Sequence, residues 1–246
     1  MYIDLEKTYA FRWNNLKLEP IIHLESVENE DLLFLDSQKK FSMKNIQSFV
    51  SSKPFLNMLF TGPRGTGKSS LVKMLLTMYK NRGLRVVEYP QECITSIYNL
   101  YSILRDNKSF FFLLFFDDIS FDESDVYYRK FKSIMEGGLE ETPTNCMFIA
   151  TSNKRHMIKE KAFDSADIYN SDLINEDMSL FARFGLSLIF PLWDKDQYLA
   201  LVDFYFNKFS IKKPDMWQRE AENFAINRGG RSARVAKQFV IFCHFA

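Results

Sequence analysis

The segment GPRGTGKS, at residues 62–69, stands between two apolar runs and has the composition of a phosphate-binding loop. Gly62, Gly65 and Gly67 permit backbone conformations in which successive N–H groups converge on one anion. Lys68 adds a positive charge, and the hydroxyl of Ser69 adds an oxygen ligand for Mg²⁺. The spacing matches the G-x-x-x-x-G-K-[ST] pattern, which predicts binding of a nucleoside triphosphate. The residues predicted to contact the nucleotide are Gly62, Pro63, Arg64, Gly65, Thr66, Gly67, Lys68, Ser69 and Ser70.

Two adjacent acidic residues, Asp117 and Asp118, follow the most apolar run of the chain. A carboxylate at the end of a buried parallel strand lies beside the phosphate-binding loop in nucleotide-binding α/β proteins. We therefore expect Asp117 to hold Mg²⁺ together with Ser69, and Asp118 to polarise the attacking water. Glu123 competes with Asp118 for the second role, and either aspartate could instead cap the following turn.

These side chains need a scaffold, and the pattern of the chain predicts an α/β fold. Short apolar runs alternate with segments of helical periodicity, which is typical of a parallel sheet covered by helices. A helical stripe follows the glycine-rich loop, and Gly83 stands where a glycine would end that helix. The five candidate strands are Pro54–Phe60, Leu84–Tyr89, Ser109–Phe116, Met147–Thr151 and Leu186–Phe190.

From about residue 194 the strand pattern is replaced by three helical segments, which predict a small helical domain. Residues 154–179 are polar and weakly periodic, so we expect a long loop or insertion there. The predicted helices are Asp194–Phe209, Pro214–Asn227 and Ser232–Phe245. The predicted division is an N-terminal extension at 1–30, a nucleotide-binding domain at 31–192 and a helical domain at 193–246.

Composition narrows the class of protein further. A chain of 246 residues that is 46% hydrophobic can bury a sizeable core, and its net charge of +1 indicates neither a nucleic-acid nor a membrane partner. The three cysteines lack metal-ligand spacing and are typical of a reducing compartment. The longest apolar run, Phe110 to Phe116, is too short to span a bilayer, and the N-terminus is too polar for a secretion signal. We expect a cytoplasmic protein without a membrane partner.

Five blocks of the sequence together resemble a known family. GPRGTGKSS, FFDDISFDE, MEGGLEETPTNCMFIATSNKRHM, SLFARFGLSLIF and GGRSARVAKQFV are similar, in order and spacing, to a small, functionally uncharacterised bacterial family of predicted P-loop ATPases in the AAA+ class. The resemblance extends from about Leu32 to the end of the chain. It implies a three-layer αβα domain with a five-stranded parallel sheet in the order 5-1-4-3-2, a helical lid, and ATP with Mg²⁺ as ligands.

The resemblance also implies roles for residues outside the glycine-rich loop. Asn153 matches the sensor asparagine that orients the attacking water, and Arg183 resembles the arginine finger that reaches the nucleotide of a neighbouring subunit. This second role implies a homo-oligomer. Arg234 matches the lid arginine that contacts the nucleotide, and Arg231 is close enough in sequence to take that role instead.

Each of these roles has an alternative interpretation. Asn153 could close a turn after its strand, and Arg183 could pair with Asp177 or Glu176 of its own chain. The arginines at 228, 231 and 234 could form a solvated face or contact nucleic-acid phosphates.

The function that fits best is a Mg²⁺-dependent, ATP-hydrolysing AAA+ protein that couples nucleotide state to subunit or partner contacts. The alternative is a nucleotide-controlled binding switch or nucleic-acid-loading factor with little turnover. A P-loop kinase fits less well, because no arginine cluster beside an acceptor pocket can be identified.

Most members of the wider class have Glu where Asp118 stands, and Asp reaches about 1.5 Å less far, so we expect slow hydrolysis. The residues indicate no particular protein or nucleic-acid substrate.

Overall fold

The apolar runs form a seven-stranded sheet within residues 4–119, 126–136, 140–153 and 183–245, which are the residues described by this computed structural model. The order is β2-β1-β4-β5-β6-β3-β7, and neighbouring strands are parallel except for the antiparallel pair β1 and β2. The strands are β1 (Ala10–Trp13), β2 (Leu18–Pro20), β3 (Met58–Thr61), β4 (Leu84–Glu88), β5 (Phe111–Phe116), β6 (Cys146–Ser152) and β7 (Leu186–Ile189).

The five predicted strands correspond to β3–β7, and their observed order, β7-β3-β6-β5-β4, follows the predicted 5-1-4-3-2. The prediction of a five-stranded, wholly parallel sheet was nevertheless wrong, because β1 and β2 extend the sheet beyond β4. Both added strands are short; Arg12 interrupts the apolar pattern of β1, and Pro20 ends β2 at the sheet edge. Such brief and interrupted strands give little periodic signal.

Helices cover both faces of the sheet because its central strands are apolar on both sides. Alternate residues of β5 take opposite faces: Phe112 and Leu114 pack in the cluster that contains α3 and α4, whereas Leu113 packs in the cluster with α1 and α2. The helices of this body are α1 (Asp36–Phe49), α2 (Lys68–Tyr79), α3 (Ile97–Asp106) and α4 (Val126–Glu136). Short 3₁₀ helices lie at η1 (Asn29–Asp31), η2 (Lys80–Arg82) and η3 (Gln91–Ser96).

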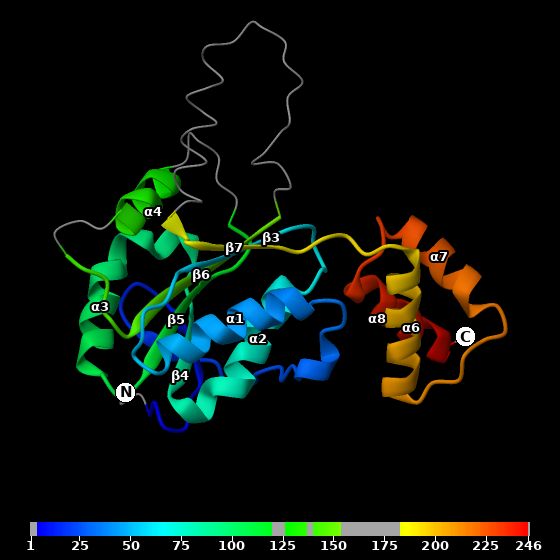
Figure 1. Cartoon of the computed structure of the whole chain (residues 1–246), viewed down its shortest axis with the longest axis horizontal. Coiled ribbons are helices and arrows are strands. Elements are labelled where there is room, and N and C mark those ends of the chain that lie inside the picture. The colour runs from blue at the N-terminus through cyan, green and yellow to red at the C-terminus, as the bar shows by residue number, and fades with distance from the viewer. Residues whose placement is uncertain (1–3, 120–125, 137–139, 154–182, 246) are drawn as a thin grey trace, which may run out of the picture.

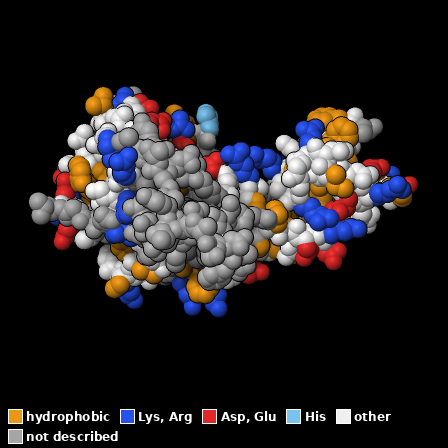
Figure 2. Space-filling view, turned by 90° about the horizontal axis from the view of Figure 1, so that it is seen from above, with side chains coloured by type: hydrophobic (Ala, Val, Ile, Leu, Met, Phe, Trp, Pro, Cys, Tyr) orange, Lys and Arg blue, Asp and Glu red, His pale blue; other side chains and the backbone are white. Residues whose placement is uncertain are grey.

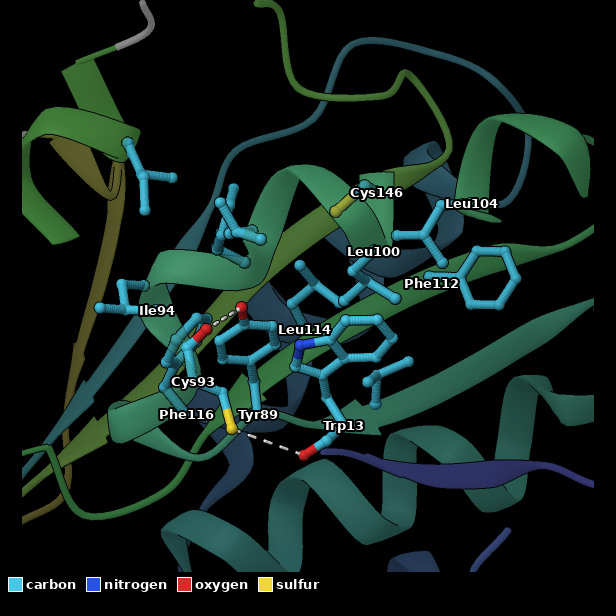
Figure 3. Packing of buried hydrophobic residues seen from close by; sticks show 14 of the residues in the cluster. Trp13, Tyr89, Cys93, Ile94, Leu100, Leu104, Phe112, Leu114, Phe116 and Cys146 are labelled. Carbon is cyan, nitrogen blue, oxygen red and sulfur yellow. Dashed lines mark hydrogen bonds between the residues drawn. The ribbon is translucent and has the colours of Figure 1, made fainter. Parts of the chain in front are cut away.

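The N-terminal strand β1 belongs to this core. Figure 3 shows the indole of Trp13 among Leu100, Phe112 and Leu114, and all four side chains are fully buried. The hydroxyl of Tyr89 donates to the carbonyl of Cys93 at 2.8 Å in the same cluster. The three cysteines are free thiols.

The C-terminal part forms a small helical lobe, joined to the body by the segment after β7 (Figure 1). Its helices are α6 (Lys195–Phe209), α7 (Trp217–Asn227) and α8 (Ala233–Phe245), close to the predicted bounds. Asp194 begins α6 with a capping box, accepting from the backbone N–H of Gln197 at 2.8 Å. Figure 2 shows Lys and Arg side chains gathered at the junction of the two lobes. We call this lobe the lid.

The predicted loop at 154–179 lies outside the described residues, and so does Glu123. The predicted extension at 1–30 contains β1, β2 and most of η1, while the division of the chain at residues 30 and 192 stays a prediction. None of the helices in the described residues is long and apolar enough to cross a membrane.

Candidate functional site

The glycine-rich loop connects the end of β3 to the first turn of α2, which is the context that a phosphate-binding loop requires. Gly62 has φ +146° and lies against β7, where an added Cβ atom would stand 2.1 Å from the carbonyl oxygen of Phe190. Only glycine fits this position. The loop closes further through the Thr66 hydroxyl, which donates to the Pro63 carbonyl at 2.8 Å.

Lys68 is the first residue of α2, and its ammonium group lies under the loop. Nζ donates to the carbonyl oxygens of Gly62 at 2.6 Å and Pro63 at 2.8 Å, and to Oδ1 of Asn153 at 2.9 Å. The side chain is only 6% exposed. Burial lowers the pKa of Lys68, and the negative charges of Asp118 and Asp117 oppose that shift. The loop and the adjacent carboxylates therefore hold a cation at the start of the helix.

Asp117 stands directly after β5 and is held by two hydroxyl groups. Its Oδ1 accepts from the hydroxyl of Ser69 at 2.7 Å and from the hydroxyl of Thr151 in β6 at 2.7 Å. The parallel pairing of β5 with β6, and of β6 with β3, brings these three residues to the same end of the sheet. The predicted pair Ser69 and Asp117 is thus brought together.

Asp118 has a left-handed backbone conformation, with φ +54°, which is uncommon for a residue other than glycine. Its backbone N–H donates to the hydroxyl of Thr151 at 2.8 Å, which holds this turn against β6. Its Oδ1 accepts from the amide of Asn153, and its Oδ2 accepts from the guanidinium of Arg64 at 3.1 Å. Strained backbone of this kind costs about 1–3 kcal/mol and is found often at functional sites.

A cavity of about 760 Å³ opens above these side chains, between the body and the lid. Its polar wall contains Lys68, Ser69, Asp117, Asp118 and Asn153. A further, apolar part comes from the segment before α1 and from the lid, and consists of Leu32, Leu33, Leu35, Trp193, Leu201, Tyr205 and Phe209.

The lid contributes exposed cations to this cavity. Arg234, near the start of α8, lines it together with Lys237. Arg231 does not line it and instead forms a two-bonded ion pair with Glu222, with N–O distances of 3.0 and 2.6 Å. This pair raises the pKa of Arg231 and lowers that of Glu222. Of the two arginines considered from the sequence, Arg234 is therefore the one at the cavity.

Two polar contacts link the lid to the body, and Leu33 also packs against the hydrophobic core of the lid. The backbone N–H of Ala233 donates to the carbonyl of Gly65 at 3.1 Å, and Lys208 of α6 pairs with Asp31 of η1. Gly65 has φ +77°, and an added Cβ there would stand 2.8 Å from Cβ of Ser232. The lid is thus close-packed against the loop at one point.

Arg183 lies away from this cavity. It precedes β7, whose Leu186 pairs with Met58 at the start of β3, whereas the loop follows the other end of β3. Arg183 is therefore at the opposite end of the sheet, half-buried, and is not among the described residues that line the cavity. Its predicted partners, Glu176 and Asp177, lie outside the described residues.

Sequence reasoning missed three contributors to the site. Thr151 binds both aspartates, but a threonine at the end of an apolar strand has no distinguishing pattern. The segment at 25–35 forms a cavity wall, with Glu25 paired to Lys73 at 2.7 Å. Trp193 also lines the cavity. Only its position beside the start of the lid could have drawn attention to it.

The residues present fit a nucleotide with Mg²⁺. Gly62 leaves room for a close backbone turn, and Ser69 with Asp117 offers the hard oxygen ligands that Mg²⁺ prefers. Within the described part of the chain, no group of three His, Cys, Asp or Glu residues could hold a metal ion. The cavity also offers a hydrogen-bond donor to a ligand. The Nε1–H of Trp193, a residue that lines the cavity, is buried and has no hydrogen-bond partner among the described residues.

Comparison with solved structures identifies the fold. The chain is similar to the RuvB Holliday junction branch migration motor of Thermotoga maritima, with a TM-score of 0.56 and 15% sequence identity over 88% of this chain and 63% of that protein. A substituted form of the same motor matches with a TM-score of 0.55 and 12% identity, over 88% of this chain and 64% of that one. The chain thus spans less than two thirds of the motor it resembles.

No curated protein matches the sequence. The model of the family described as "Protein of unknown function (DUF815)" matches residues 6–244. That match covers nearly the whole chain, and the fold agrees with the AAA+ resemblance of the five sequence blocks. The chain belongs to the DUF815 family and has the fold of AAA+ P-loop ATPases.

Proposed function

We propose that this protein binds ATP with Mg²⁺, hydrolyses it, and couples the nucleotide state to contacts with a neighbouring subunit or another partner. The observation that carries this proposal is the meeting of Lys68, Ser69 and the two aspartates with Asn153 on one wall of the cavity. These residues come from two strand ends and one helix start that lie far apart in the sequence, so chance proximity along the chain does not explain their meeting.

The start of α2 would bind the phosphates. The first N–H groups of a helix have no acceptor within the helix and stand at the positive end of its dipole, which favours an anion. Leu71 makes the first bond of this helix, to the Gly67 carbonyl at 2.8 Å, so the N–H groups of Lys68, Ser69 and Ser70 can bind oxygens of the ligand. The ammonium of Lys68 would exchange loop carbonyls for phosphate oxygens.

Ser69 and Asp117 would hold Mg²⁺ through their oxygens. The metal, when bound, neutralises part of the phosphate charge. Asp118 is proposed to accept a proton from the attacking water, and Asn153, bonded to Asp118, is proposed to orient that water. Glu123 stays the alternative proton acceptor and lies outside the described residues.

Two arginines are proposed to complete the site from different directions. Arg234 would reach the phosphates from the lid, which we take as residues 193–246, next to a nucleotide-binding domain at 31–192. Arg183 would act on the nucleotide of a neighbouring copy, because its place at the far end of the sheet keeps it from its own cavity. Such fingers accelerate hydrolysis by about 10³–10⁵ in P-loop enzymes.

The experiment that tests this function measures phosphate release from Mg²⁺·ATP per chain as the protein concentration is raised. The total rate of phosphate release should rise more steeply than linearly with protein concentration, so the rate per chain should increase. Both rates should collapse in Arg183→Ala, while nucleotide affinity changes little. A mixture of Arg183→Ala and Asp118→Asn chains should regain part of the activity, since each supplies what the other lacks.

Turnover per chain that is independent of concentration, with no gain in the mixture, would contradict the subunit contact. The protein would then act as a monomeric, nucleotide-controlled switch. The absence of any Mg²⁺·ATP binding would contradict the whole proposal.

A further inference from the structure

Arg64 occupies the third position of the glycine-rich loop and contacts the carboxylate proposed to activate water. Its guanidinium lies 3.1 Å from Oδ2 of Asp118, and the two side chains are 75% and 47% exposed. The other oxygen of Asp118 accepts from Asn153. Both oxygens of this carboxylate are thus engaged by side chains of the protein itself.

The same network reaches the second cation of the loop. Asn153 donates to Asp118 through its amide nitrogen and accepts from Lys68 through its amide oxygen at 2.9 Å. Arg64 and Lys68 therefore bind opposite ends of one connected set, Arg64–Asp118–Asn153–Lys68, on the polar wall of the cavity. A change of partner at either cation alters the hydrogen bonds available to Asp118.

The Arg64–Asp118 contact is easily exchanged. A single contact between exposed side chains adds little stability, because water and salt screen it and long side chains lose freedom in it. A terminal phosphate carries more charge than one carboxylate, and the planar guanidinium suits it well. Arg64 lines the same cavity as Lys68 and Ser69, so a phosphate bound there would compete with Asp118 for it.

We propose that Arg64 senses the terminal phosphate of a triphosphate bound to its own chain, exchanging Asp118 for that phosphate. Asp118 is then released to bind the attacking water only when a triphosphate is in place. A diphosphate lacks the third (γ) phosphate that would draw Arg64 away, so the carboxylate stays paired. This inference rests on the proposed function and adds a control step within one subunit.

The first test is equilibrium binding of ADP and of a non-hydrolysable ATP analogue, with Mg²⁺, to the full chain. Arg64→Gln should weaken binding of the analogue by about tenfold and change ADP binding by less than about twofold, since one charge-assisted contact is lost. Arg105→Gln is the matched control, because Arg105 also pairs with a carboxylate, Glu140, but lies outside this cavity. It should leave both affinities unchanged.

The second test is a double-mutant cycle on the same binding reaction. Asp118→Asn removes the competitor for Arg64 and should strengthen binding of the analogue several-fold in the parent chain. In the Arg64→Gln background, Asp118→Asn should increase the affinity for the analogue by a clearly smaller factor. Asparagine tolerates the left-handed conformation at position 118, so the variant should fold.

An equal increase in affinity for the analogue from Asp118→Asn in both backgrounds would show a general effect of charge and would overturn the proposed exchange of partners. An equal decrease in the affinities for ADP and for the analogue in Arg64→Gln would also overturn it. A parent chain that binds neither nucleotide would remove the proposed function and this inference together, whereas normal binding with an unchanged preference in Arg64→Gln removes this inference alone.

Discussion

The two walls of the cavity are built differently. On the body side, Lys68 is buried, and Asp117 accepts two hydrogen bonds of 2.7 Å from hydroxyls on separate elements. On the lid side, Arg234 and Lys237 are exposed, and the lid reaches the loop itself through one backbone bond of 3.1 Å from Ala233. The body wall is fixed by the sheet, while few contacts among the described residues join the lid wall to the body.

This difference indicates a division of labour. A sheet holds catalytic groups in place because each is anchored by strand pairing and buried packing. A lid with few contacts changes position at low cost, so its arginine can respond to what is bound. We therefore expect substitutions on the body wall to affect chemistry most and substitutions on the lid to act more weakly.

The largest effect is expected from the two aspartates of the body wall. Asp118→Asn should bind the triphosphate at least as tightly as the parent and slow hydrolysis by about 10²–10⁴, because an amide does not accept the proton of the water. Asp117→Asn should instead weaken binding that depends on Mg²⁺. Phosphate release and nucleotide affinity, each measured with and without Mg²⁺, separate the two. If Glu123→Gln rather than Asp118→Asn abolishes turnover, the assignment of the base is wrong.

A smaller effect is expected from the lid arginine. Arg234→Ala should reduce affinity for the triphosphate by about tenfold, through the loss of one exposed charge-assisted contact. Arg231→Ala is the matched comparison, since Arg231 pairs with Glu222 and does not line the cavity. The affinity of Arg231→Ala for the triphosphate, measured in the same titration, should match that of the parent. The reverse ranking would reassign the lid arginine.

The point of contact between the walls can be tested through Gly65. An alanine there meets Ser232 and must adopt a left-handed conformation, which costs about 1–2 kcal/mol. Gly65→Ala should lower the free energy of unfolding by about that amount and weaken nucleotide binding. Denaturant unfolding, read beside the binding titration, measures both. An unchanged stability would show that the lid does not rest on the loop as described.

The smallest effect concerns the ion pair inside the lid. The pKa of Glu222 is lowered by Arg231, so the pair stabilises the fold at pH values above the ordinary pKa of the carboxyl and is lost as pH falls through the lowered value. Glu222→Gln should cost less than about 1 kcal/mol at neutral pH, since the pair is partly exposed. Thermal midpoints of parent and variant should converge in acid. A constant difference at all pH values would contradict this origin.

Much of the body could be predicted from the sequence because its signals are local. The loop at 62–69, the apolar β5 and the aspartates after it each have a distinct pattern, and the strand order followed from the resemblance. The added strands β1 and β2 were missed because they are short, because Arg12 interrupts the apolar pattern of β1, and because Pro20 ends β2.

The choice between Arg231 and Arg234 shows what local pattern does not determine. The two residues stand three positions apart near the start of a predicted helix, so the sequence gives no reason to prefer one of them. What separates them is Glu222, which the packing of α7 against α8 brings to Arg231. Thr151 is a similar case, since its role comes from the pairing of β6 with β5.

The most direct test of nucleotide binding by the loop is a calorimetric titration of Mg²⁺·ATP into the full chain and into Lys68→Ala. Lys68 has three acceptors in the structure and is expected to exchange them for phosphate oxygens, and its charge-assisted contacts are each worth about 1.5–3 kcal/mol. We expect saturable binding to the parent and a loss of affinity of about a hundredfold or more in Lys68→Ala. Equal binding by both chains would contradict it.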